Sequence, residues 1–239
     1  MSALVTLYQF ELCPFCHKVR AALELKGISY ERVEVSPMDK KGLPPLPPEA
    51  PRKVPVMRSG ERIIWDSSEI LQRIDELAPE GVSLVPDDSP QQARAIELDR
   101  WISDNLIAAL PTVIYGSWRD AARAAQITAA GSNFNRLQGV GVRVGGSLIM
   151  RQIAKRILKR HGRRDGEAWV EELVDQLERW LGDGEFLQGE KLTIADAAAH
   201  GAFSCVADFP VFERAMRRPR LRAWFDRVQA LREVRPRAA

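Results

Sequence analysis

The stretch that decides the fold is residues 4–27, LVTLYQFELCPFCHKVRAALELKG. Its first part, 4–10, is apolar and rich in residues that favour strands. Pro14 then stands where the first turn of a helix tolerates a proline, and a helical run continues to Gly27, a typical C-terminal stop. The pattern therefore predicts a strand followed by a helix, with the CPFC motif of residues 13–16 at the junction.

The next segments extend this beginning into a small α/β unit. Alternating residues predict a strand over 29–35, and six prolines between residues 36 and 52 predict an extended loop. Further strands are expected over 54–57 and 62–65, and the Asp66-x-x-Glu69 spacing predicts a helix that begins with a capping box. The expected order is β-α-β-β-β-α with a proline-rich loop.

The second part of the chain has a helical pattern and no strand signal. We predict a first domain over 1–78, a turn-rich linker over 79–90 and an all-helical domain over 91–239. Helices are expected over 91–110, 149–161 and 167–181, and a further one opens at Thr193 with a capping-box variant. Residues 111–148 give no definite prediction, because alanine-rich and glycine-rich pieces alternate there.

Composition narrows the class of protein. The chain has 239 residues, 45% of them hydrophobic and 28% charged, so it can bury a core of ordinary size. The N-terminal residues do not read as a secretory signal, and no apolar run approaches the 18 residues of a membrane span. We therefore expect a cytoplasmic protein without a membrane anchor. Three cysteines are too few for a disulfide framework.

The motif Cys13-Pro14-Phe15-Cys16-His17 allows several interpretations. It matches a dithiol centre at the start of a helix, and it also matches the C-x-x-C-H pattern of covalent haem attachment. Two inert buried cysteines are a third possibility, and a zinc site would need a second pair of ligands that the sequence does not offer at a matching spacing. We favour the dithiol, expect neither covalent haem nor a metal, and expect His17 to be partly exposed beside the thiols.

The position of the two thiols assigns them different roles. Cys13 would lie at the helix N-terminus, where free backbone N–H groups and the helix dipole favour a thiolate. Cys16 would lie within the first turn, where it resolves a mixed disulfide or packs beside the nucleophile. We therefore predict Cys13 as the catalytic nucleophile, with Cys16 as its partner.

Two further motifs follow along the first domain. In Lys53-Val54-Pro55-Val56, a cis bond before the proline would turn the backbone of Val54 outward to pair with a peptide-like ligand; the simpler interpretation is an edge strand that starts with proline. Asp66-Ser67-Ser68 at a helix start suits a carboxylate, or is ordinary capping. A thiol, a strand-edge peptide contact and a carboxylate site together match a γ-glutamyl-cysteinyl tripeptide.

The order of these motifs, with LTIADAA in the helical part, resembles the glutathione transferase superfamily over nearly the whole chain. The segments TLYQFELCPFCHKVR, RKVPV, DSSEI and AKRILKRH are most similar to the branch that contains prostaglandin E synthase type 2. Phe10 stands where that branch has a tyrosine near the thiol.

The resemblance implies a thioredoxin-like first domain, glutathione as co-substrate and catalysis by the first cysteine of the pair. We also expect a homodimer, which is common in that superfamily, and the resemblance makes noncovalent haem binding possible. The glutathione contacts expected on this basis, together with their neighbours, are Phe15, Lys53, Val54, Pro55, Asp66 and Ser67. Trp101, Tyr115 and Trp118 are candidates for an electrophile pocket or for ordinary packing.

Charge is distributed unevenly although the net charge is only +3. Residues 121–164 hold ten arginines and lysines and no acid, whereas residues 167–185 hold seven acids and one arginine. The basic segment is either a surface for nucleic acid or anionic membrane, or one half of an antiparallel helix pair whose charges are complementary. We favour the helix pair and expect no nucleic acid partner.

The function predicted from the sequence is that of a glutathione-dependent enzyme. It would be a transferase or a thiol–disulfide exchange enzyme acting through Cys13 on a small electrophile or a mixed disulfide. The alternative is a glutathione-binding module without catalysis that uses the basic segment 121–164 as a contact surface. Turnover distinguishes the two, because the second would bind glutathione and a polyanion but catalyse nothing.

Overall fold

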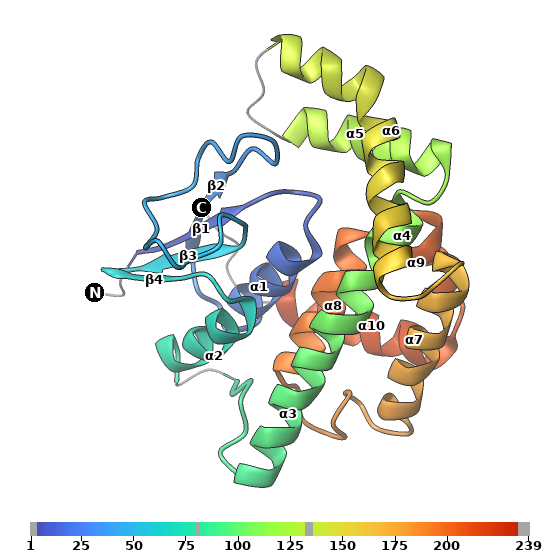
Figure 1. The fold of residues 1–239 in the computed structure, drawn as a ribbon. Helices are drawn as coiled ribbons and strands as arrows, with labels where there is room; N and C mark the ends of the chain where they lie inside the picture. The colour runs from blue at the N-terminus through green and yellow to red at the C-terminus, as the bar shows by residue number, and fades with distance from the viewer. Residues whose placement is uncertain (1–3, 80–81, 132–135, 234–239) are drawn as a thin grey trace.

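The computed structural model describes residues 4–79, 82–131 and 136–233, and Figure 1 shows how its strands and helices are arranged. The first part contains a four-stranded sheet and two helices. Their bounds are β1 Val5–Gln9, α1 Pro14–Leu25, β2 Tyr30–Glu34, β3 Val56–Ser59, β4 Arg62–Ile64 and α2 Ser67–Leu77. The predicted order of elements, β-α-β-β-β-α with an irregular loop before β3, is confirmed.

The sheet has the strand order β2-β1-β3-β4. β1 pairs parallel with β2, and the pairs β1–β3 and β3–β4 are antiparallel. A parallel pair needs a crossover connection, which α1 supplies. β3 and β4 form a tight hairpin in which Gly60 adopts a φ of +60°, a conformation that glycine takes without steric cost.

The two faces of the sheet are covered by different parts of the first domain. Val5 and Leu7 of β1 belong to the main hydrophobic core together with the buried residues of α1 and α2. Tyr8 and Val56 belong to a second, smaller cluster, against which Leu43 and Leu46 of the proline-rich loop pack. The loop therefore serves as the cover of one sheet face, which an extended, proline-rich chain can provide without a helix.

The second part is built of helices. Their bounds are α3 Ser89–Trp101, η1 Ile102–Ile107, α4 Ala108–Ile114, α5 Trp118–Gly131, α6 Arg136–Arg160, α7 Gly166–Leu181, α8 Ile194–Cys205, α9 Pro210–Ala215 and α10 Pro219–Glu233. The predicted helix over 91–110 corresponds to α3, η1 and α4 in succession, because the helix widens to a π-helical turn over Ile102–Ile107. Such turns are rare and are often found at functional sites.

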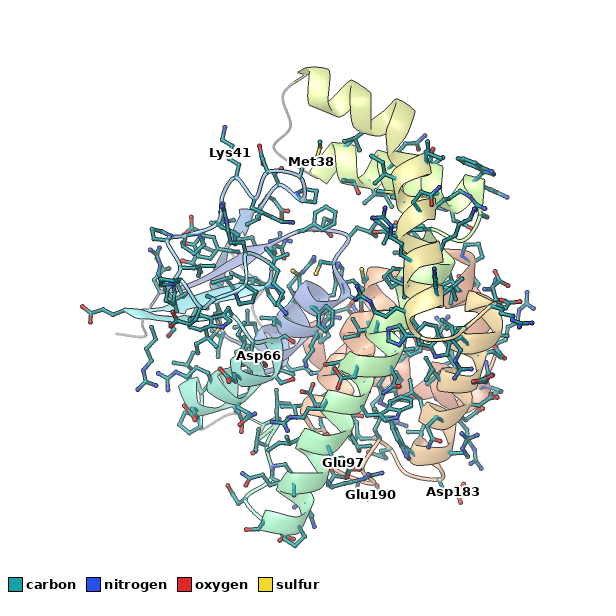
Figure 2. The ribbon with its side chains drawn as sticks, viewed as in Figure 1. Met38, Lys41, Asp66, Glu97, Asp183 and Glu190 are labelled. Atoms are coloured by element: carbon teal, nitrogen blue, oxygen red, sulfur yellow. The ribbon has the colours of Figure 1, made fainter. Side chains whose placement is uncertain are left out.

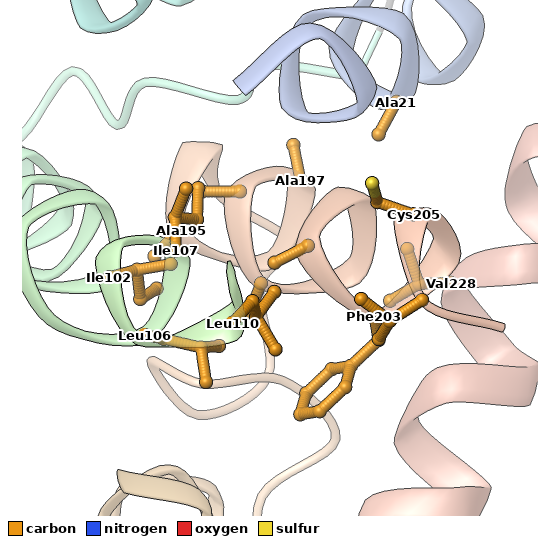
Figure 3. Close-up of a cluster of buried hydrophobic side chains, with 14 of the residues drawn as sticks. Ala21, Ile102, Leu106, Ile107, Leu110, Ala195, Ala197, Phe203, Cys205 and Val228 are labelled. Carbon is orange, nitrogen blue, oxygen red and sulfur yellow. The ribbon is translucent and has the colours of Figure 1, made fainter. Parts of the chain in front are cut away.

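The small-residue helix α8 lies at the centre of the molecule and packs along α1 (Figure 3). Gly201 allows this close approach: a Cβ built there would lie 2.5 Å from the backbone nitrogen of Lys18 and 2.6 Å from the carbonyl oxygen of His17. Asp196 completes the capping box with Thr193 and also accepts a hydrogen bond from Nε1 of Trp224 on α10, at 2.8 Å. The predicted start of α8 is confirmed.

The expected pairing of the basic and acidic helices is wrong. α6 packs on α4 and α5, and α7 packs on α4 and the helices that follow it (Figure 1). Most acids of α7 are paired from elsewhere, because Arg218 contacts Glu171, Asp175 and Glu178. From the basic segment, Arg163 in the connecting loop contacts Glu172. The spacing of apolar residues predicted a helix in each segment. It could not predict which other helices each of them packs against, because that depends on the tertiary structure. No described helix is both long and apolar enough to cross a membrane.

Candidate active site

Cys13 is the N-cap residue of α1 and is partly exposed, whereas Cys16 in the first turn is buried. The thiol of Cys16 and then the backbone N–H groups of Cys16 and Phe15 lower the pKa of Cys13 by hydrogen bonding to its sulfur. Burial and the neighbouring Cys13 raise the pKa of Cys16 well above its ordinary value. The geometry therefore favours the thiolate form at Cys13 over that at Cys16, whose thiol donates a hydrogen bond to the Cys13 sulfur.

His17 lies on the other side of the same turn and is buried, which corrects the expectation of a partly exposed residue. Its Nε2 lies 2.9 Å from the backbone oxygen of Glu11. Burial, followed by the charge of Arg20, lowers the pKa of His17 to about 4, so the ring is neutral and Nε2 donates the hydrogen bond. His17 therefore holds the loop between β1 and α1 rather than facing a ligand.

A cavity of about 440 Å³ opens between the first domain and α3. All six residues expected to contact glutathione line it: Phe15, Lys53, Val54, Pro55, Asp66 and Ser67. The Val54–Pro55 peptide bond is cis. Asp66 marks the end of α2 that faces α3 (Figure 2). The structure thus brings together in one cavity residues that are up to 52 positions apart in the sequence.

Asp66 caps α2, so part of the helix end that was expected to bind a ligand carboxylate is already used within the chain. Its Oδ1 accepts hydrogen bonds from the backbone N–H groups of Ser68, at 2.9 Å, and Glu69, at 3.1 Å. Two of the free N–H groups of the helix end are therefore already bound within the chain. The backbone and hydroxyl of Ser67 remain as the donors of this helix end for a ligand carboxylate.

Part of the cavity wall was missed by the sequence reasoning. Arg100, Ser103 and Asp104 come from α3 and η1 of the helical part, and Trp65 and Gln72 come from the first domain. The cavity consequently carries charges of both signs: cationic Lys53 and Arg100, and anionic Asp66, Glu69 and Asp104. The signal in the sequence was the polar run Ser103-Asp104-Asn105 between the apolar pairs 101–102 and 106–107.

Lys18 lies beneath this cavity and is fully buried, again without having been predicted. Its Nζ is 2.6 Å from Oδ1 of Asp99 and donates hydrogen bonds to Ser103 Oγ, at 2.9 Å, and Ser68 Oγ, at 3.0 Å. Burial lowers the pKa of Lys18, and the carboxylate of Asp99 opposes that effect. A lysine inside an amphipathic helix gives no sign in the sequence that it will be buried and paired.

A second cavity of about 310 Å³ lies between the loop after β2 and helices α5 and α6. Its wall is mostly apolar and includes Phe10, Met38, Tyr115, Met150 and Ile153. Met38 points toward α5 in Figure 2. Along the chain Cys13 lies between Phe10, which lines this cavity, and Phe15, which lines the first.

The three aromatic residues considered for an electrophile pocket have different surroundings. Tyr115 lines the second cavity. Trp101 packs edge-on against Trp180 with 4.6 Å between ring centroids, and Trp118 is exposed beneath the guanidinium of Arg151. Only Tyr115 of the three therefore borders a cavity suited to an apolar ligand.

Two family models match the sequence. Residues 7–95 match the glutathione S-transferase N-terminal domain, and residues 164–231 match the glutathione S-transferase C-terminal domain. The chain belongs to the glutathione S-transferase superfamily. The protein is therefore a glutathione transferase-like enzyme, and the family uses glutathione as co-substrate. It is called the transferase below.

Relatives of known name support the same family. Prostaglandin E synthase 2 of Mus musculus is 24% identical over a match that covers 98% of this chain and 72% of the relative. The corresponding protein of Danio rerio is 22% identical, with 94% and 70% covered. A probable glutathione S-transferase of Nicotiana tabacum is 36% identical over 46% of this chain and 49% of the relative. The resemblance to the prostaglandin E synthase branch is confirmed.

Solved structures share the fold. Glutathione transferase F7 of Populus trichocarpa superposes with a TM-score of 0.65 at 16% identity, covering 95% of this chain and 94% of the other. A beta-etherase of Sphingobium gives a TM-score of 0.62 at 20% identity, covering 96% and 99%. The thioredoxin-like domain followed by a helical domain is thereby confirmed. Noncovalent haem has no support in these comparisons, and the described residues contain no cluster of three or more histidines, cysteines or acids suited to a metal.

Proposed function

We propose that the transferase catalyses glutathione-dependent thiol–disulfide exchange through Cys13. The observation that carries the proposal is the difference between the two thiols: Cys13 is partly exposed with a lowered pKa, and Cys16 is buried with a raised pKa. A thiolate is the nucleophilic form of cysteine, so the exposed member of the pair is also the more reactive one.

The exchange needs two displacements. The Cys13 thiolate attacks the glutathionyl sulfur of a mixed disulfide, a bond forms between Cys13 and glutathione, and the other thiol leaves as a thiolate that takes a proton from water. A second glutathione thiolate then attacks the glutathionyl sulfur on Cys13. This step releases oxidised glutathione and restores the Cys13 thiolate, with Cys16 again donating its thiol hydrogen bond.

The charged cavity supports glutathione as the bound thiol. Its γ-glutamyl end carries an ammonium and a carboxylate, and the cavity offers Asp66 and Asp104 for the first and Ser67 with Arg100 for the second. Phe15 and Val54 would flank the cysteinyl part next to Cys13. The apolar second cavity would hold the other half of the mixed disulfide, or an electrophile if glutathione attacks it directly.

The test separates the two cysteines. Cys13→Ser should abolish exchange with a glutathionylated substrate, because a hydroxyl cannot form the mixed disulfide. Cys16→Ser should retain turnover and accumulate a glutathione adduct on Cys13, seen by intact mass after treatment with oxidised glutathione. Alkylation of the native enzyme should modify Cys13 well before Cys16 and Cys205, since burial raises the pKa values of those two.

Three results would contradict the proposal. An active Cys13→Ser with an inactive Cys16→Ser would reverse the assignment. Full activity of both variants in disulfide exchange would show that the thiol of glutathione acts without either cysteine. Conjugation of an electrophile without any exchange activity would favour direct attack by glutathione.

A second candidate function is favoured by the failure of the expected helix pairing. In the part of the chain that the structure describes, Lys155, Arg156 and Lys159 are exposed and form no ion pair. We infer that the part of the basic segment 121–164 around these three residues is available as a contact surface for an anionic partner, whereas Arg123 and Arg163 of the same segment are already paired. Salt-sensitive retention on a polyanion, lost when these three residues are replaced by glutamate, tests this; retention unchanged by the replacement would contradict it.

A further inference from the structure

The buried amine of Lys18 connects the two domains directly under the charged cavity. Lys18 and Ser68 belong to the first domain, on α1 and at the start of α2. Asp99 and Ser103 belong to the helical domain, on α3 and in the π-helical turn η1. All three oxygens lie within 3.0 Å of the same nitrogen: the two serine hydroxyls accept hydrogen bonds from the ammonium, and Asp99 forms an ion pair with it.

Two of these acceptors are also wall residues of the cavity. Ser68 and Ser103 line it from opposite domains, next to Ser67 and Asp104 in the sequence. Lys18 itself has no exposed surface and does not line the cavity. A ligand therefore meets residues held by Lys18 and never Lys18 itself.

Stability alone is a poor explanation for this arrangement. A buried ion pair pays a large desolvation cost, so replacing both partners with apolar residues is often neutral or stabilising. Among the described residues, neither oxygen of the buried Asp99 carboxylate accepts a hydrogen bond of ordinary geometry, although Oδ1 forms the ion pair with Lys18. What an ammonium supplies that an apolar side chain cannot is a fixed geometry, because two directed hydrogen bonds and one ion pair hold three elements in register.

We propose that Lys18 is a positioning residue for glutathione, which sets the distance between the Asp66–Ser68 end of α2 and the Ser103–Asp104 side of η1. The inference rests on the proposed use of this cavity for glutathione. The γ-glutamyl group would have to meet acceptors and donors from both domains at once, so a shift of either wall weakens binding. Lys18 is also close enough to Asp66 and Asp104 to interact electrostatically with both.

The test uses the complete chain. It distinguishes an effect of Lys18 on the position of the cavity walls from an effect on the stability of the fold. Lys18→Met leaves Asp99 buried without its cation and should lower both the unfolding temperature and the affinity for reduced glutathione. The double variant Lys18→Met with Asp99→Leu removes both charges and should recover stability. Its affinity, measured by calorimetric titration, should remain about tenfold or more below that of the native enzyme, which corresponds to the loss of one hydrogen bond to a charged group.

Two control variants define the reference. Lys26→Met breaks the other buried lysine pair, in which Nζ of Lys26 lies 2.8 Å from Oδ1 of Asp75 away from the cavity, and should lower stability while leaving affinity unchanged. Asp99→Asn keeps Lys18 and both serine contacts and should keep most of the affinity. Native affinity in the double variant, or an equal loss of affinity in Asp99→Asn and Lys18→Met, would overturn the inference.

A second readout does not depend on glutathione. Hydrogen exchange at the amides of residues 67–69 and 102–107 should be faster in the double variant than in the native enzyme, while exchange in α7 stays the same. Unchanged exchange at both segments would overturn the positioning role. If the native enzyme itself fails to bind glutathione, the proposed function falls, and hydrogen exchange still decides whether Lys18 fixes the two walls.

Discussion

At the scale of single residues, neighbours on one helix turn have opposite chemical roles. Cys13 and Cys16 are three positions apart, yet the first is at the helix end with its sulfur among N–H donors and the second is inside the core. His17 follows at once and is neutral and buried. The helix start thus leaves the thiol of Cys13 partly exposed and buries the side chains of Cys16 and His17.

The neutral state of His17 predicts a dependence of stability on pH. Its pKa is about 4 in the folded enzyme and about 6.5 in an unfolded chain, so the unfolded state binds the proton first as the pH falls. His17 should therefore cost nothing above pH 7 and about 3 kcal/mol of unfolding free energy by pH 4. The measurement is denaturant unfolding between pH 7 and pH 4.

His17→Gln supplies the comparison for this prediction. The glutamine amide can still donate to the oxygen of Glu11 but does not titrate, so the variant should lose less stability than the native enzyme over the same range. His200 is also buried with a lowered pKa and contributes equally to both proteins. Identical pH profiles for the two proteins would show that His17 does not carry the effect.

At the scale of elements, α8 and α6 show how packing depends on what glycine permits. In α8, Gly201 allows the backbone of α1 to occupy the space that the methyl group of an alanine would need. In α6, Gly145 is exposed and faces open space, so there glycine only weakens the helix. The same residue type is required in one helix and dispensable in the other.

The two glycines give a matched pair of substitutions. Gly201→Ala should lower the free energy of unfolding by about 3 kcal/mol, because the added methyl meets backbone atoms that cannot move aside. Gly145→Ala should raise it by about 0.5 to 1 kcal/mol through helix propensity. Chemical denaturation of both variants measures this. A Gly201→Ala enzyme as stable as the native one would mean that α1 and α8 lie further apart.

The acidic helix α7 gives a second prediction at this scale. Arg218 is 17% exposed in its side chain and contacts three acids of α7, so Arg218→Gln should leave those acids facing one another and lower stability by about 1 kcal/mol. Replacing Lys155, Arg156 and Lys159 of α6 by glutamine should leave stability unchanged. Thermal unfolding compares the two proteins, and a larger loss in the α6 variant would restore the helix pairing expected from the sequence.

At the scale of the whole molecule, the two domains share buried polar contacts as well as an apolar interface. Beside the Lys18 cluster, Arg232 near the end of α10 contacts Glu24 of α1, with 2.9 Å between Nε and Oε2. Its Nη1 lies 2.8 Å from Nδ1 of His200 and 3.0 Å from Oγ of Ser204. The last helix is thereby tied to the first. A homodimer and a cytoplasmic location remain predictions.

This contact predicts a large effect for a residue far from the cavity. Arg232→Leu should lower the free energy of unfolding by about 3 kcal/mol, because it leaves Glu24 largely buried without its cation. Arg222→Leu on the same helix removes an exposed pair with Asp226 and should leave stability close to that of the native enzyme. Equal midpoints in denaturant for both variants would show that Arg232 does not tie the domains together.

The sequence by itself determined the order of elements in the first domain and the position of Cys13 at a helix end. Strand alternation, the proline at the helix start and the Asp66 cap act over a few residues, so the order of elements in the first domain, the start of α8 and the place of Cys13 at a helix end could be read from it. The glutathione contacts expected at Val54, Asp66 and Ser67 came instead from the resemblance to a family, and they remain predictions. Glycines hid the first half of α6, because their low helix propensity is overridden by packing on α4 and α5.

Only the tertiary structure decided which side chains meet. Contacts between Lys18 and Asp99, or between Arg232 and Glu24, join positions 81 and 208 residues apart, and no local pattern records them. The same holds for the wall of the cavity that α3 and η1 contribute, and for the separation of α6 from α7. Burial turns an ordinary lysine into a fixed donor and an ordinary histidine into a neutral one, because the cost of desolvation depends on the whole surrounding fold rather than on neighbours in the chain.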